Sequence, residues 1–223
     1  MPQDDHAFTT IDAAGMDSPT AYRLLVGAVV PRPIAWITTV DGTGRVNLAP
    51  FSSYNYVATS PPMLAVNVAL RAGTEGEEKD TARNMRETGE FVVNVATEDN
   101  MEAIRLSAQN YPPEISEVED IGLRTLPASK VRPPRLADTP IQMECRLDQA
   151  VTLGRGINTL FIGEVVAFHL SDRVFDGQRV DVTRLRPISR LGGPFFGGLG
   201  EVYNRPMLQY APGGEGSVDG DTS

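Results

Sequence analysis

PRPIAWITTVDGTGRVNLAPFSSYNYVATSPP, at residues 31–62, predicts two strands joined by a tight turn. Residues 34–40 are rich in β-branched and aromatic side chains, which favour a strand on a partly buried sheet. Residues 41–44, DGTG, tolerate positive φ and therefore predict a hairpin turn. A second strand-like run at 45–56 continues toward Pro61 and Pro62, which stop it because proline cannot donate a ladder hydrogen bond.

The second run carries several neutral polar side chains among apolar ones, namely Asn47, Ser52, Ser53 and Asn55. A flat ligand with polar edges needs apolar walls and a few fixed hydrogen bonds from its pocket. A barrel hairpin with solvated serines and asparagines explains the same pattern. Composition alone favours that plainer explanation.

Beyond residue 62 the chain predicts further short strands separated by loops. They are expected at residues 63–70, 91–96, 122–126, 141–153, 157–171 and 185–191. Residues 192–200, GGPFFGGLG, fit neither the helical nor the strand period. These features favour an all-β barrel decorated by a few short helices.

Three short helices are expected. One begins near Ser18, a candidate cap, and ends at Gly27, with Leu24 and Leu25 facing the barrel. Another occupies residues 80–89, with Asp80 or Thr81 as its cap, and a third follows Thr97.

The helix at 80–89 is short enough to need support. A phosphate at its N-terminus would supply that support, because free backbone N–H groups point there, and Lys79 and Thr81 stand where they could add hydrogen bonds. An ordinary capped surface helix beside a chance lysine is the alternative, and without further information it is favoured.

Length and composition narrow the possible functions. The 223 residues suit one domain, and 41% of them are hydrophobic, which is enough for a core. Seven of the carboxylates lie in the first twenty and last thirteen residues, so residues 21–210 carry only −2 of the net charge of −9. No basic stripe is present to hold nucleic acid.

Targeting and metal signals are missing from the sequence. It has no apolar run long enough for a membrane span and no basic, apolar N-terminal leader, so a cytoplasmic protein without a membrane role is expected. One cysteine, Cys145, and two histidines, His6 and His169, exclude an internal disulfide and a zinc or iron cluster. Nucleophile and Walker motifs are also missing, so no catalytic residue is identified.

Several motifs in order resemble the flavin reductase-like, FMN-binding split-barrel family. They are PRPIAW at 31–36, NLAPFS at 47–52, KDTARNMRETGEFVVN at 79–94, FIGEV at 161–165 and LRPISRLGG at 185–193. The resemblance spans residues 22–193. It implies a split β-barrel of Greek-key type, FMN as the cofactor and a homodimer. A flavin would also explain an enzyme without a protein nucleophile, because the cofactor carries the chemistry.

The resemblance also implies site residues. Asn47, Ala49, Ser52, Ser53 and Asn55 are expected along the isoalloxazine and ribityl chain, with Lys79, Thr81 and Asn84 near the phosphate. Arg32 is either a second phosphate partner or an exposed arginine before a strand, and Trp36 is expected in the core. Residues 154–158, GRGIN, place Asn158 where related flavin reductases carry a histidine.

The expected function is that of an NAD(P)H:flavin reductase or of the reductase component of a two-component monooxygenase, with NADH or NADPH as transient electron donor. The alternatives are an FMN-binding electron carrier or flavin-holding protein, and a barrel that binds another planar ligand. We expect a flexible segment at 1–16, a single domain at 17–210 and a disordered tail at 211–223. Residues 111–140 and 192–210 are expected at the dimer interface or its rim.

Overall fold

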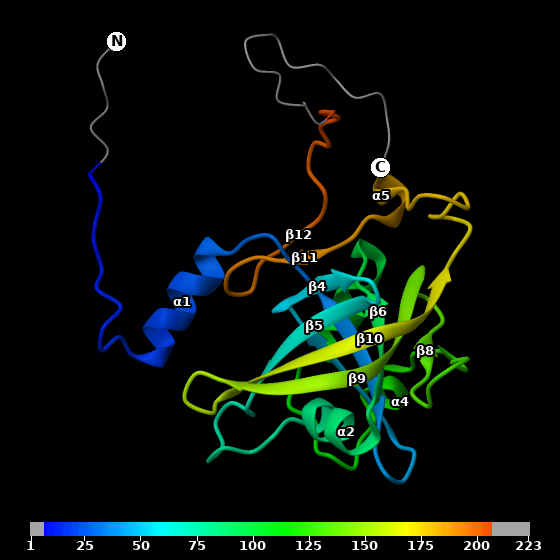
Figure 1. Ribbon diagram of the computed structural model, residues 1–223, viewed down its shortest axis with the longest axis horizontal. Coiled ribbons are helices and arrows are strands. Elements are labelled where there is room, and N and C mark those ends of the chain that lie inside the picture. Colours follow the sequence, from blue (N-terminus) through cyan, green and yellow to red (C-terminus); the bar gives the residue numbers. More distant parts are fainter. Residues whose placement is uncertain (1–6, 207–223) are drawn as a thin grey trace.

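The computed structural model describes residues 7–206 (Figure 1). In chain order the elements are α1 (Ser18–Ala28), β1 (Arg32–Pro33), β2 (Ala35–Val40), β3 (Val46–Phe51), β4 (Tyr54–Thr59), β5 (Pro62–Ala69), α2 (Asp80–Thr88), β6 (Glu90–Val95), the 3₁₀ helix η1 (Glu98–Asn100), α3 (Met101–Leu106), α4 (Glu117–Ile121), β7 (Thr125–Leu126), β8 (Arg135–Leu136), β9 (Ile141–Leu153), β10 (Asn158–Leu170), α5 (Val182–Leu185), β11 (Ser189–Arg190) and β12 (Phe196–Gly197).

The main sheet has seven antiparallel strands in the order β3-β2-β6-β9-β10-β5-β4. Its two outer strands, β3 and β4, are consecutive in the chain and meet at Ser52 and Ser53, where the Asn67 N–H donates to the Ser53 carbonyl at 2.8 Å. The sheet therefore curls into the expected split barrel with a few short helices around it.

Strand β2 shows why the barrel has apolar groups on both faces. All six of its residues are buried. Ala35 and Ile37 pack into the barrel core with Phe51, Phe91 and other residues, whereas Trp36 points to a second apolar cluster outside the barrel wall. Alternate side chains of a strand point to opposite faces, so both faces of β2 are covered. Trp36 is a core residue, as expected, and its indole N–H donates to the Ser107 hydroxyl at 2.8 Å.

Helix α2 lies across one end of the barrel (Figure 1). Ala82 and Met85 belong to the barrel core, and Gly89 ends the helix with a φ of 68°. The cap expected from Asp80 or Thr81 is wrong, because Lys79 occupies the N-cap position and makes no capping side-chain bond. Asp80 instead pairs with Arg71 at 2.7 Å and also with Arg83.

Helix α1 differs from its expected packing. Asp17, not Ser18, caps it, by accepting from the Thr20 N–H. No residue of α1 is buried: Leu24 is 44% exposed and does not face the barrel as expected, whereas Leu25, 63% exposed, faces the barrel across a cavity that it lines. The helix lies beside the barrel, next to the small sheet β1-β11-β12 (Figure 1).

Three other expectations need correction. The run at 45–56 is two strands, because the chain bends at Ser52 and Ser53 to reach the opposite edge of the sheet. The strand expected at 185–191 is reduced to β11, since α5 and a left-handed Arg186 precede it. The edge segment at 122–126 is reduced to β7, which pairs only with β8, and α4 precedes it. The segment at 192–200 is irregular, as expected, apart from the two-residue strand β12.

The expected domain limits at 1–16 and 17–210 stay predictions, and residues 1–6, 207–210 and the predicted tail at 211–223 lie outside the described residues. Within residues 7–206 no helix is long and apolar enough to cross a membrane.

Candidate functional site

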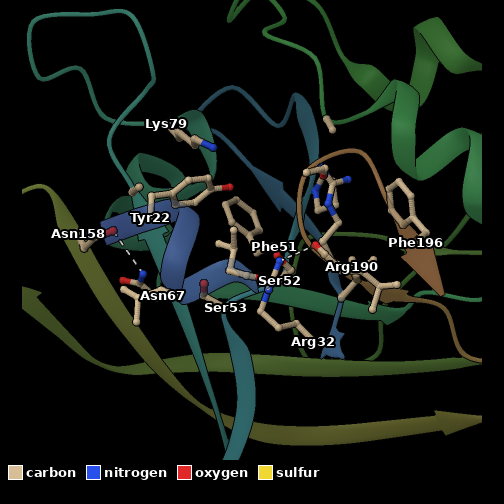
Figure 2. Close-up of a pocket in the computed structure, with 18 of the residues that line it drawn as sticks. Tyr22, Arg32, Phe51, Ser52, Ser53, Asn67, Lys79, Asn158, Arg190 and Phe196 are labelled. Atoms are coloured by element: carbon tan, nitrogen blue, oxygen red, sulfur yellow. Dashed lines mark hydrogen bonds between the residues drawn. The ribbon is translucent and has the colours of Figure 1, made fainter. Parts of the chain in front are cut away.

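A cavity of about 650 Å³ lies between the barrel wall and the layer formed by α1 and the small sheet (Figure 2). The barrel contributes Phe51, Ser52 and Ser53 from the β3–β4 bend, Asn67 from β5 and Asn158 from the start of β10. The covering layer contributes further side chains, among them Tyr22, Leu25, Arg190 and Phe196. The volume lies within the range of small-molecule sites in proteins.

The floor of the cavity has unused hydrogen-bonding groups. The Asn67 amide donates to the Asn158 side-chain oxygen at 3.3 Å, but the buried Oδ1 of Asn67 has no partner within residues 7–206. Exchanging the amide oxygen and nitrogen would only turn an unpaired acceptor into an unpaired donor. Leaving such a group buried costs about 1–3 kcal/mol, so a polar ligand atom is expected here.

The charge of the cavity is of one sign. Arg32, Lys79 and Arg190 line it, and none of the lining residues in the described part of the chain is Asp or Glu. Because the whole chain carries −9, this is a local reversal of its charge. The cavity therefore favours anionic ligands.

Lys79 follows the loop at 71–78 and is half-buried. Its ammonium lies 5.6 Å from the centre of the Phe51 ring, and no carboxylate in the described chain pairs with it. Burial lowers the pKa of Lys79, and the nearby Arg71 charge lowers it further. A bound anion would offset both the burial of the Lys79 charge and its repulsion by Arg71, so this cation is suited to hold a phosphate.

Arg32 is buried, so the alternative of an exposed arginine is wrong. Its guanidinium donates to the carbonyls of Val26 and Val29 at 2.7 Å and to the Leu191 carbonyl at 2.9 Å. These bonds tie the end of α1 to the segment that follows β11. Arg32 thus holds the covering layer in place.

Five of the ten sequence-predicted residues line the cavity: Arg32, Ser52, Ser53, Lys79 and Asn158. Three others form a network with Thr39 between β2, β3 and α2. Asn47 donates to Thr81 at 2.9 Å and to Thr39 at 3.3 Å, and Asn84 donates to Thr39 at 3.0 Å. Their side chains fasten α2 to the barrel, and their flavin contacts stay predictions.

The last two predicted residues also lie outside the cavity lining. Ala49 packs against the barrel core. Asn55 is on β4, where its side chain accepts from the Tyr56 N–H at 2.9 Å, and it lines a separate groove of about 430 Å³. Sequence reasoning missed Asn67, Tyr22, Arg190 and Phe196. Asn67 could have been found as the single polar residue in its strand, and Arg190 belongs to the LRPISRLGG motif.

Neither the described histidine nor the cysteine belongs to this cavity. His169 is at the far end of β10, 2.5 Å from the buried Glu144, and Cys145 is fully buried in the barrel core. Burial raises the pKa of the Cys145 thiol, which keeps it neutral and unreactive.

The sequence profile described as "Flavin reductase like domain" matches residues 26–184. An uncharacterised protein of Halalkalibacterium halodurans is 43% identical over 193 residues, which cover 84% of this chain and 91% of that protein. Two solved structures are also similar. Nitrilotriacetate monooxygenase component B from Bacillus cereus has 37% identity and a TM-score of 0.84, with 89% of this chain and 99% of that chain covered. The 2-nitrobenzoate 2-nitroreductase of Pseudomonas fluorescens has 30% identity and a TM-score of 0.82, with 92% and 98% covered.

Proposed function

Because this chain belongs to the flavin reductase-like family, a flavin-binding family, we propose that it is an FMN-dependent NAD(P)H oxidoreductase. We propose more narrowly that it acts as an NAD(P)H:flavin reductase or as the reductase component of a two-component monooxygenase. The observation that carries the proposal is the cavity itself, which combines a buried amide oxygen without a partner, free serine hydroxyls and cations with no carboxylate among the described lining residues.

The residues of the cavity fit FMN. Lys79 would bind the phosphate, because it is a half-buried cation without an acidic partner among the described residues. Asn67 and Asn158 would bind polar edges of the ring, and Ser52 and Ser53 have hydroxyls that form no hydrogen bond inside residues 7–206. The bound flavin supplies the hydride-accepting chemistry. The protein's task is to orient the flavin and a nicotinamide against each other and to exclude water.

The names of two similar proteins support an oxidoreductase function. The Bacillus cereus protein is named as component B of a monooxygenase, and the Pseudomonas fluorescens protein is named as a nitroreductase. Both names describe redox proteins, and both chains are covered almost completely by this one. A redox role is thus common to both names, and the name of the Bacillus cereus protein favours the narrower proposal of a monooxygenase component.

We also propose a homodimer. Phe195, Val202 and Tyr203, which do not line the cavity, are 65%, 55% and 64% exposed, so the described part of the 192–210 segment has an uncovered apolar surface. A second copy could bury it together with residues 111–140. Sedimentation should therefore show a dimer at micromolar concentration, and a monomer would contradict this part of the proposal.

The test of the enzyme function mixes the purified protein with FMN and NADH, or NADPH in parallel, under air, and follows loss of the nicotinamide absorbance. Rapid oxidation that requires FMN supports the reductase. Reduction of the bound flavin only by an added redox partner would contradict NAD(P)H turnover and would identify an electron carrier. Comparing the rates with NADH and with NADPH also shows which electron donor the protein uses.

The cavity lining also predicts a flat pH profile. None of its residues in the described chain is His, Asp, Glu or Cys, and histidine is the side chain that ordinarily changes charge between about pH 5 and 8. The rate of flavin reduction at saturating nucleotide should be nearly constant from about pH 6 to 8. Asn158→Ala should slow this step or weaken nucleotide binding without creating a pH dependence. A bell-shaped profile that disappears in His169→Ala would contradict the assignment.

A further inference from the structure

The cavity holds more positive charge than one phosphate requires. Lys79 lies on one side of Phe51 and Ser52, together with Asn67 and Asn158, whereas Arg190 and Phe196 lie on the other side (Figure 2). FMN carries a single phosphate group. A cation at each end of one cavity indicates two anionic groups, bound at separate places.

The guanidinium of Arg190 is held in position while some of its N–H donors form no hydrogen bond with the described residues. Its guanidinium carbon lies 4.6 Å from the centre of the Phe196 ring, and Nη2 donates to the Gly193 carbonyl at 2.5 Å. Nε and Nη1 have no acceptor anywhere in the described residues. Stacking on an aromatic face and one backbone bond orient the guanidinium while leaving part of its fork available for a ligand.

Arg32, the cross-strand neighbour of Arg190, provides an internal contrast. The Arg32 guanidinium donates to three backbone carbonyls, so its donors are used inside the protein, unlike those of Arg190. The acidic residues Glu98 and Asp99, which follow β6, are paired with Arg186 rather than with Arg190. Arg190 is therefore a half-buried cation that no described carboxylate neutralises.

The surroundings of Arg190 are apolar. Phe196 packs with Ile34 and Ile104 in the second apolar cluster, and Ile34, Ile104 and Leu191 line the cavity. The Lys79 end instead presents the two asparagine amides. A guanidinium fork among apolar walls matches a planar carboxylate attached to a flat apolar body.

From this geometry we infer that the Arg190 end of the cavity is a second anion site, which binds the carboxylate of a small, flat apolar acid beside the flavin. The inference rests on the proposed function, in which Lys79 takes the FMN phosphate. The acid is then a substrate or effector of the flavoprotein, and Arg190 determines the preference for acids over neutral compounds of the same shape.

The test compares benzoate with its neutral analogue benzamide. Binding to the FMN-loaded protein is measured by calorimetry and by the change in the absorbance of the bound flavin. Benzoate should bind more tightly than benzamide, and Arg190→Met should weaken benzoate roughly 10- to 150-fold while leaving benzamide unchanged. Arg190→Lys, which keeps the charge but loses the fork, should recover part of the affinity. Equal binding of benzoate and benzamide to the wild-type protein would overturn the inference.

Two controls separate this inference from the proposed function. Arg190→Met should keep the wild-type preference for FMN over riboflavin. Loss of that preference would place the FMN phosphate at Arg190. The inference would then be overturned, but the proposal that the protein binds FMN would still hold. ADP-ribose serves as a second probe. If Arg190→Met weakens the binding of ADP-ribose but not that of benzoate, the site binds a nucleotide phosphate, and the carboxylate assignment is overturned. If FMN fails to bind at all, the proposed function fails, and Arg190-dependent binding of benzoate to the flavin-free protein would still support the anion site.

Discussion

The two walls of the cavity are built in different ways. The barrel wall belongs to a seven-stranded sheet whose core side chains, such as Phe91 and Phe161, are fully buried. The covering layer consists of α1, which has no buried residue, and strands only two residues long. Hydrophobic burial stabilises the first wall, and a few polar and ring contacts position the second. Stability and access to the cavity can therefore change independently.

Phe91→Ala should produce the largest loss of stability. Phe91 is fully buried, and its ring lies against Gly163, where an added Cβ would stand 2.6 Å from Phe91 Cζ. Removing it should lower the free energy of unfolding by about 3–5 kcal/mol. Tyr22→Ala on the covering layer, where Tyr22 is 67% exposed, should change it by about 0.5 kcal/mol or less. Urea denaturation measures both variants, and similar losses would contradict the difference between the walls.

Acid should weaken the barrel through Glu144. Burial by itself raises the pKa of this carboxyl, but the N–H groups of Ser129 and Lys130 and the His169 ring lower it from 4.5 to about 2. Because the pKa of Glu144 is lower in the folded state, its ionised form stabilises the fold above about pH 4.5. This stabilisation is lost as the pH falls toward 2. The contribution at neutral pH is at most about 3 kcal/mol, because solvent near the partly exposed His169 screens the Glu144 charge.

Glu144→Gln tests this contribution. The difference in unfolding free energy between wild type and Glu144→Gln should be largest above about pH 5 and should shrink by about pH 3. Urea titrations at several pH values measure it. A difference that does not change with pH would mean that the Glu144 charge does not stabilise the barrel.

Arg32→Met should have a smaller effect on stability and a clear effect on the covering layer. The change leaves the carbonyls of Val26, Val29 and Leu191 without their donor, at a cost of about 1–3 kcal/mol. Because those bonds hold α1 against the small sheet, bound FMN should also dissociate faster. Stopped-flow measurement of FMN release checks this, and unchanged release would show that Arg32 does not secure the cavity's cover.

The same contrast explains what could be predicted from the sequence. Strands β2, β5, β6, β9 and β10 were predicted because runs of β-branched and apolar residues mark them locally. The bend at Ser52 and Ser53 was not, since it is imposed by joining opposite edges of the sheet. The covering strands are too short to show any periodicity. Helix α1 was predicted in the right place, but its lack of buried residues was not, because its exposed leucines look like core residues in sequence.

The candidate site was predicted less completely than the fold. Asn47 and Asn67 have the same side chain in similar apolar strands, yet Asn47 fastens α2 and Asn67 lines the cavity. Only the tertiary arrangement separates these roles. Lys79 was predicted because the family resemblance favoured a phosphate at the start of this short helix, whereas Arg190 depends on contacts with Phe196 that the sequence does not reveal.

The most direct measurement of the central claim is the affinity of the protein for FMN and for riboflavin, which lacks the phosphate. Fluorescence quenching should show that wild type prefers FMN and that Lys79→Ala loses about 1.5–3 kcal/mol of FMN binding. Riboflavin should bind the two proteins equally, because Lys79 contacts only the phosphate in this account. Equal affinity of wild type for FMN and riboflavin would contradict the phosphate site at Lys79.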